Sequence, residues 1–167
     1  MVEKILVVDP EKCTGCRICE LACSFAKNRE FNPAVSRIKV LKVEAEGIAC
    51  PIVCAHCEQP PCKVVCPVEA IVRDEKTSAI LIREDVCIGC RACLIVCPYG
   101  AISMDSRKAM MVKCDLCQGD PRCVKLCPTE AIQYVKAEIA DMPKKRAMME
   151  KIADGVLESR RTISRVG

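Results

Sequence analysis

Sixteen of the 17 cysteines in this 167-residue chain fall into four groups of four, a pattern that constrains the fold more than any other feature. Groups one and three share the spacing C-x-G-C-R-x-C-x-x-x-C, whereas groups two and four share C-x-x-C, a proline-containing loop and C-x-x-x-C-P. This alternation indicates duplication of a two-group ancestor. In chain order the groups are Cys13, Cys16, Cys19 and Cys23; Cys54, Cys57, Cys62 and Cys66; Cys87, Cys90, Cys93 and Cys97; and Cys114, Cys117, Cys123 and Cys127.

The cysteines are not expected to form disulfides. Their number is odd, and they lie in tight clusters instead of being spread out to close long loops. The N-terminal stretch MVEKILVVDPEKC has no apolar signal core and no twin-arginine pair. These features predict a reducing, cytoplasmic location in which the thiols bind metal.

The spacing within the groups indicates which metal centre the thiols hold. Two C-x-x-C pairs separated by a long loop are the usual frame of a tetrahedral zinc site. The run C-x₂-C-x₂-C-x₃-C-P instead wraps a 4Fe–4S cluster, with three thiolates on a tight loop and the fourth cysteine reaching a neighbouring cluster. We therefore predict 4Fe–4S clusters, with a zinc-stapled interaction module as the alternative. The spacing alone allows sequential as well as crossed pairing of the groups.

The segments around the cysteines predict a small α+β fold. Residues 70–82 and 101–112 each read as a short strand, a polar turn and a second strand, and ILVV near the N-terminus also has the character of a strand. Each C-x-x-x-C-P segment fits a short helix that the proline ends. The chain has only two Phe, two Tyr and no Trp, so bound clusters are expected to fill part of the interior. The longest uncharged stretch, 92–104, is too short to span a membrane, which predicts a soluble protein.

Five residues close to the cysteines allow more than one interpretation. Gly15 and Gly89 are expected to let backbone N–H groups approach a cluster. Arg17 and Arg91 follow a ligand and could offset cluster charge, face a partner or simply be solvated. His56 could donate a hydrogen bond to sulfur, but we expect an ordinary surface or packed histidine.

The remaining cysteine and the net charge also limit the function. Cys50 is expected to be a buried small apolar residue and not a ligand. The formal charge of +4 counts thiols as neutral, whereas four oxidised clusters of about −2 each would change it to roughly −4. Nucleic-acid binding then loses its electrostatic basis. No acid–base constellation stands out, and fully ligated iron leaves no position for substrate, so we expect no catalysis by this chain alone.

In chain order the cysteine groups have the spacings C-x₂-C-x₂-C-x₃-C, C-x₂-C-x₄-C-x₃-C-P and C-x₂-C-x₂-C-x₃-C-P, followed by a fourth group. This order resembles that of the four-cluster ferredoxin-like subunits of redox enzymes, over roughly residues 5–136. These serve enzymes of the dimethyl-sulfoxide reductase type, formate hydrogenlyase, carbon monoxide dehydrogenase systems and tungsten-dependent aldehyde oxidoreductases. The resemblance implies two ferredoxin-like (βαββαβ-type) halves within 1–136, formed by groups one and four and by groups two and three. It also implies the following ligand sets: site A, Cys13, Cys16, Cys19 and Cys127; site B, Cys114, Cys117, Cys123 and Cys23; site C, Cys54, Cys57, Cys62 and Cys97; and site D, Cys87, Cys90, Cys93 and Cys66.

The same resemblance implies an electron-transfer subunit of a soluble complex in anaerobic metabolism. Four 4Fe–4S clusters would relay electrons between a catalytic subunit and a soluble acceptor or a further redox subunit. Two features depart from the family pattern: Ser24 replaces the proline after Cys23, and the loop QGDPR is shorter than in membrane-linked relatives. They favour soluble partners, with a tungsten or molybdenum pterin aldehyde oxidoreductase as the first choice. The alternatives are a carbon monoxide dehydrogenase, a hydrogenase, a formate dehydrogenase, or a free polyferredoxin without a fixed partner.

The last segment, 137–167, contains no cysteine and predicts a helix from Asp141 onwards. Met148, Ile152 and Val156 would form a narrow apolar stripe along it. The stripe could pack on the protein's own core. We also expect it to dock on the catalytic subunit or on a second copy of the chain, as a C-terminal docking tail.

Overall fold

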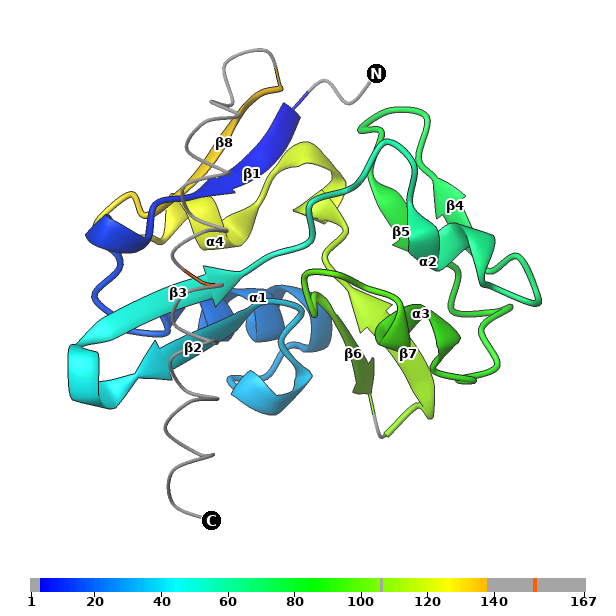
Figure 1. Ribbon diagram of the computed structural model, residues 1–167, viewed down its shortest axis with the longest axis horizontal. Helices are drawn as coiled ribbons and strands as arrows, with labels where there is room; N and C mark the ends of the chain where they lie inside the picture. The colour runs from blue at the N-terminus through cyan, green and yellow to red at the C-terminus, as the bar shows by residue number, and fades with distance from the viewer. Residues whose placement is uncertain (1–3, 106, 138–151, 153–167) are drawn as a thin grey trace. The chain divides into compact units, whose positions relative to one another are not determined.

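The structure is a computed structural model that describes residues 4–105, 107–137 and 152 (Figure 1). The chain divides into two units, residues 1–137 and residues 138–167. The first unit contains all 17 cysteines. The predicted docking tail falls in the second unit and, apart from Ile152, lies outside the described residues, so its helical structure stays a prediction.

The first unit is a small mixture of short strands and helices, as the α+β prediction requires. Among the described residues its strands are β1 (Lys4–Val8), β2 (Lys39–Val43), β3 (Ile48–Ile52), β4 (Ile71–Arg73), β5 (Ile80–Ile82), β6 (Ile102–Asp105), β7 (Met110–Lys113) and β8 (Ile132–Lys136). The α-helices are α1 (Ile18–Asn28), α2 (Pro61–Val64), α3 (Ala92–Ile95) and α4 (Arg122–Lys125). Short 3₁₀ turns lie at Pro10–Lys12, Pro33–Val35, Glu44–Glu46 and Leu116–Gly119.

The strands of the described residues pair in four antiparallel two-stranded sheets, β1–β8, β2–β3, β4–β5 and β6–β7. The hairpins predicted in 70–82 and 101–112 are confirmed as β4–β5 and β6–β7. The β1–β8 pair joins the two ends of the first unit, because Lys4 lies opposite Lys136 and Val8 opposite Ile132. This long-range pairing brings the loop of group one next to the segment that follows group four (Figure 1).

The β2–β3 hairpin was not predicted from the sequence. Its strands carry few buried positions, and Leu41, Val43 and Ile48 are exposed apolar side chains on it. Pro51 also lies within β3, where proline ordinarily argues against a strand. Cys50 belongs to the same strand and is only half-buried, so the expectation of a buried residue was wrong.

The helices confirm the prediction that a proline after the fourth cysteine limits each C-x-x-x-C segment. Helices α2, α3 and α4 are four residues long, and each ends before its C-x-x-x-C-P segment reaches the proline. Helix α1, where Ser24 stands in place of the proline, continues to Asn28 and has 11 residues. The buried Ser24 hydroxyl donates to the Leu21 carbonyl at 3.0 Å and accepts from the Asn32 N–H at 3.2 Å. The absence of proline therefore lengthens the helix and adds a side-chain contact to the loop after it.

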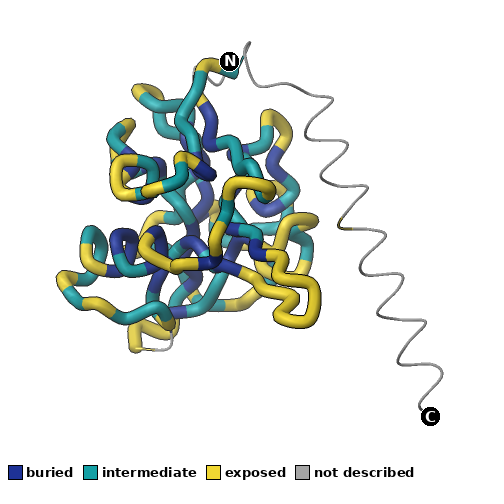
Figure 2. Tube along the Cα trace, turned by 90° about the vertical axis from the view of Figure 1, so that its left-hand side faces the viewer, coloured by how far each residue is buried: buried dark blue, intermediate teal, exposed yellow. Residues whose placement is uncertain are grey.

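Two apolar clusters make up the described core. Figure 2 shows which stretches of the chain are buried. The first cluster includes cysteines of groups one and four, namely Cys19, Cys23 and Cys123, together with residues such as Leu6 and Ile132. The second includes Cys62 of group two and Cys93 of group three, together with Ile71, Ile80, Ile102 and Met111. The thiols thus take positions that aromatic side chains would normally fill in a domain of this size. None of the helices in the described part of the chain has the length and apolar character needed to cross a membrane.

Candidate metal centres

Three pockets in the first unit are each lined by four cysteines. The first is lined by the site C set, in which Cys54, Cys57 and Cys62 meet Cys97. The second is lined by the site A set, Cys13, Cys16, Cys19 and Cys127. The third is lined by the site D set, Cys66, Cys87, Cys90 and Cys93. In each pocket the structure therefore places three cysteines of one group with the fourth cysteine of another group.

Three of the site B cysteines lie at the first apolar cluster, because Cys23 and Cys123 belong to it and Cys114 packs against it. Burial raises the pKa of the Cys123 thiol, and the nearby thiols of Cys114, Cys23 and Cys117 raise it further. Burial also raises the pKa of Cys23, with Cys117 adding to the effect. Helices α1 and α4, which carry Cys23 and Cys123, pack against each other. The four thiols of site B are therefore close enough to interact electrostatically.

Helix geometry explains how one segment serves two sites. Cys19 and Cys23 lie one turn apart on α1 and are both buried. The chain enters this helix through Arg17, which has a left-handed backbone with φ of 62°. Arg91 occupies the same position before α3, with φ of 65°. This repeated turn leaves Cys16 and Cys90 on exposed loops while Cys19 and Cys93 face the core.

The donor sets fit multi-iron clusters better than single ions. Burial raises the pKa of Cys19 and Cys114 to about 12 and that of Cys93 to about 11, so the thiolate forms need positive charge close by. A zinc site would place its ligands about 2.0–2.3 Å from a single ion. Among the described His, Cys, Asp and Glu side chains, no group of three or more could hold one metal ion. Four thiols spread around an apolar pocket are instead the ligand set that a 4Fe–4S cluster requires.

The two motif glycines differ in what surrounds them. A Cβ on Gly89 would lie 2.2 Å from the Ala109 carbonyl oxygen, which is backbone and cannot easily move. A Cβ on Gly15 would lie 2.8 Å from the terminal Cε of Lys42, a flexible side chain. Both glycines have φ of +67°. The close approach of backbone at Gly89 explains why site D needs glycine there.

We expect Gly89→Ala to destabilise the loaded protein more than Gly100→Ala. Gly100 also has a positive φ, +59°, but a Cβ there would meet nothing within 4 Å, so it controls for backbone conformation alone. The control should cost about 1–2 kcal/mol, and the clash at Gly89 should add about 1–3 kcal/mol. Loss of the visible absorbance of the clusters in guanidinium chloride measures both variants. Equal losses would show that the contact with Ala109 does not matter.

Arg17 has a structural partner that the sequence did not reveal. Its Nε lies 2.8 Å from Oε2 of Glu20, a carboxylate with no exposed surface. The other oxygen, Oε1, accepts the Val40 N–H at 2.7 Å. Oε2 has no hydrogen bond of good geometry, so the contact with Arg17 is a charge pair. Arg17 therefore pairs with a buried carboxylate, although its own side chain remains 52% exposed.

His56 and Lys113 lie in the wall of the site C pocket. Sequence reasoning treated His56 as ordinary and overlooked Lys113. His56 is 1% exposed, and its Nδ1 accepts the Ile80 N–H at 2.9 Å. Lys113 is 3% exposed and donates to the carbonyls of Ile80 and Cys114. The only sequence signal for either residue is its place beside a ligand cysteine.

Comparison with known proteins decides the family. A model described as "4Fe-4S dicluster domain" matches residues 45–137, more than half of the chain, and a "4Fe-4S binding domain" model matches residues 4–25. The chain belongs to the 4Fe–4S dicluster domain family. The predicted cofactor class, 4Fe–4S clusters, is thereby confirmed.

Curated relatives of this dicluster protein include subunits of redox complexes. It is 41% identical over 93 residues to the "Aliphatic sulfonate oxidoreductase, polyferredoxin-like subunit" of Pyrococcus furiosus, which covers 56% of this chain and 53% of the relative. It is 41% identical over 102 residues to "Hydrogenase-4 component A" of Escherichia coli, covering 61% and 48%. It is 38% identical over 114 residues to the "Putative electron transport protein YsaA" of Escherichia coli, covering 64% and 70%. The chain spans about half the length of the first two relatives.

A solved structure supports the fold of the dicluster protein. One chain of the BamBC active-site complex of benzoyl-coenzyme A reductase, determined with zinc, matches with a TM-score of 0.50. The match covers 95% of this chain and 97% of that chain, with 24% sequence identity. At this identity the similarity concerns the fold alone.

Proposed function

We propose that the chain is an electron-transfer subunit that binds four 4Fe–4S clusters, one at each of sites A to D. The observation that carries the proposal is the grouping of cysteines around three pockets, each combining three cysteines of one group with the fourth of another. That arrangement supports the crossed ligand sets over sequential pairing. A bound cluster supplies the capacity to accept and release one electron, and no other cofactor is needed for that role.

In this proposal the two apolar clusters of the core correspond to two ferredoxin-like halves. Sites A and B would belong to the half built from groups one and four, and sites C and D to the half built from groups two and three. The protein's own contribution is to present thiolates, to surround them with apolar side chains and to exclude water. Backbone N–H groups also reach cysteine sulfurs, as from Arg37 to Cys23 and from Ala70 to Cys66, each at 3.3 Å.

The proposed partner is a larger catalytic redox subunit. The relatives named above include subunits of an oxidoreductase and of a hydrogenase, which supports a role within such a complex. We propose a tungsten or molybdenum pterin aldehyde oxidoreductase as the catalytic subunit, in the cytoplasm, with 137–167 as the docking segment. A carbon monoxide dehydrogenase, a formate dehydrogenase, a hydrogenase or a free polyferredoxin role is the alternative.

Anaerobic reductive titration tests the proposed function. The full chain, reconstituted with iron and sulfide, should take up about four electrons from dithionite and return them to an oxidised viologen dye, with no turnover of organic substrate. A colourless protein that binds zinc instead would refute electron transfer. The native complex, isolated through this subunit, should contain tungsten or molybdenum. Iron without either metal would exclude the pterin partner and leave the electron-transfer role intact.

A further inference from the structure

The imidazole of His56 is held in one tautomer by the backbone. Its Nδ1 accepts the Ile80 N–H at 2.9 Å, so this nitrogen carries no proton. An imidazole with one unprotonated nitrogen is neutral and carries its single proton on the other nitrogen. The remaining ring proton therefore sits on Nε2.

That Nε2–H is a buried donor without an acceptor. The nitrogen has no hydrogen-bond partner among the described residues, and the side chain is 1% exposed. Leaving a buried donor unpaired is unfavourable, so native structures almost always provide a partner. His56 lines the pocket of Cys54, Cys57, Cys62 and Cys97. The acceptor that this site would contain is the sulfur of a bound cluster.

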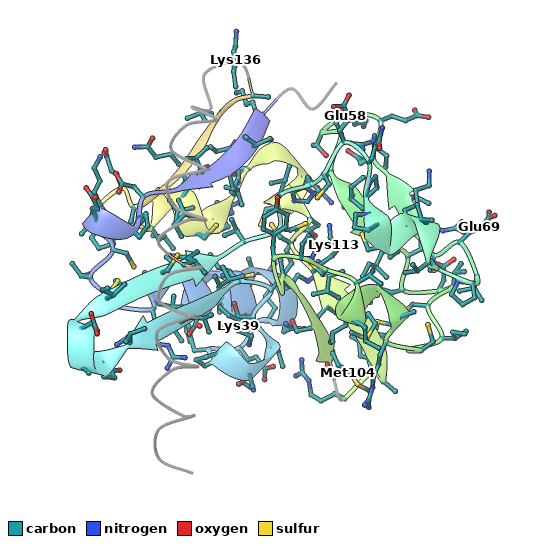
Figure 3. The ribbon with its side chains drawn as sticks, in the orientation of Figure 1. Lys39, Glu58, Glu69, Met104, Lys113 and Lys136 are labelled. Carbon is teal, nitrogen blue, oxygen red and sulfur yellow. The ribbon has the colours of Figure 1, made fainter. Side chains whose placement is uncertain are left out.

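A second, independent observation at the same pocket concerns the charge of Lys113. Lys113 lies in the interior of the first unit (Figure 3). Among the described residues its ammonium group forms no ion pair with a carboxylate. Its hydrogen bonds go to neutral carbonyl groups of Ile80 and Cys114. A buried cation needs a counter-charge. A cluster held by four thiolates carries net negative charge and would provide it.

The other two pockets lack this combination. The site D pocket is lined, besides its cysteines, by Val68, Ala70, Ile71, Ile82, Ile88 and Met111, all apolar. The site A pocket includes Arg17, but that guanidinium is paired with the buried Glu20. Of the three pockets, therefore, only that of site C combines an unpaired donor with an uncompensated buried cation in the described structure. Hydrogen bonds and positive charge favour the more negative, reduced state of a cluster.

We propose that His56 donates its Nε2–H to a sulfur of the site C cluster and that, with Lys113, it makes site C easier to reduce than sites A and D. His56 is then a positioning residue that acts on the potential and not on ligation. The inference rests on the proposed cluster at site C. A cluster bound at site C would accept one electron, which dithionite supplies as it is oxidised to sulfite, and no covalent bond of the protein would form or break.

Two substitutions of His56 separate the donor from the structural bond. His56→Asn keeps an acceptor for the Ile80 N–H but is too short to place a donor where Nε2 lies, and asparagine tolerates the φ of 47° found at this position. His56→Gln places its amide nitrogen at about the reach of Nε2 and loses the acceptor. If His56 matters only for its bond with the Ile80 N–H, asparagine should preserve its role better than glutamine. If His56 sets the reduction potential of the cluster, glutamine should preserve its role better.

The test is an anaerobic redox titration of the reconstituted full chain followed by electron paramagnetic resonance. The signal of site C is identified as the one lost in Cys57→Ser. His56→Asn should lower the equilibrium constant for its reduction about tenfold, which is about 59 mV for a one-electron couple, while His56→Gln should stay within about threefold. Lys113→Met should shift the same signal in the same direction. Lys63→Met, which removes an exposed charge beside Cys62, is the matched control and should shift nothing.

The outcomes distinguish this inference from the proposed function. A wild-type chain with fewer than four clusters, or with no signal that depends on Cys57, would refute the assignment of site C itself. Four clusters with an unchanged site C potential in His56→Asn and Lys113→Met would refute the tuning alone. An equal shift at site D in these variants would also refute it. If His56→Asn does not fold, the glutamine and Lys113 variants decide the question.

Discussion

Cys97→Ser is expected to remove or convert one cluster, and the affected cluster should be that of Cys54, Cys57 and Cys62. Cys97 belongs to group three in sequence, yet it lines the same pocket as the first three cysteines of group two. A serine oxygen is a poorer ligand than a thiolate for this cluster type. Iron and sulfide content should fall by up to one cluster of four. The paramagnetic signal should change as it does in Cys57→Ser and not as it does in Cys90→Ser.

Cys50→Ser is the matched control for this prediction. Cys50 is the remaining cysteine of the chain, is half-buried in β3 and lines none of the three pockets described above. Burial raises its pKa to about 11, and the nearby Cys13 adds to the shift, so it is a protonated thiol at neutral pH. The variant should keep the full iron and sulfide content. Loss of iron in Cys50→Ser would overturn the assignment of ligands. A Cys97→Ser signal matching that of Cys90→Ser would favour sequential pairing.

Cys23→Ser is expected to perturb the cluster of Cys114, Cys117 and Cys123, 91 or more positions further along the chain. Cys23 is buried on α1, which packs against α4, and its sulfur accepts the Arg37 N–H at 3.3 Å. Its thiol also interacts electrostatically with Cys117. The expected result is loss or conversion of one cluster of four, with a spectrum like that of Cys117→Ser.

The comparison variant for site B is Cys16→Ser, because Cys16 belongs to the same cysteine group as Cys23 but lines the site A pocket. Cys16→Ser and Cys23→Ser should therefore change different signals although the two residues are only seven positions apart. If both variants changed the same cluster, the crossed assignment of groups one and four would be wrong. Iron analysis alone could not detect that error, because each variant would still affect one cluster.

Local features of the chain could be read from the sequence because their causes are local. The C-x-x-x-C-P segments predicted short helices that proline limits, and α2, α3 and α4 confirm this. The polar turns between β-branched runs predicted the hairpins β4–β5 and β6–β7. The cluster type followed from ligand spacing within a dozen residues, and the family match confirms it.

The β2–β3 hairpin and the surroundings of His56 could not be predicted, because they depend on contacts between distant segments. The exposed apolar residues of β2 and β3 give no clear alternation, and Pro51 weakens the strand signal further. His56 would read as an ordinary histidine in any single sequence. Only the fold places its Nδ1 against the Ile80 N–H, 24 positions away, and leaves Nε2 buried without an acceptor.

The sequence by itself determined the kind of site and its sixteen candidate ligands, because each ligand loop is a short, continuous motif. Which fourth cysteine lies beside which loop was decided by tertiary structure. The spacing permits more than one pairing, and the choice depends on β1 meeting β8 and on α1 and α2 meeting α4 and α3. The buried charges differ in this respect. Arg17 pairs with Glu20 within its own helical turn. Lys113 lies in the wall of site C, where it donates hydrogen bonds to carbonyl groups of β5 and of its own neighbour, Cys114.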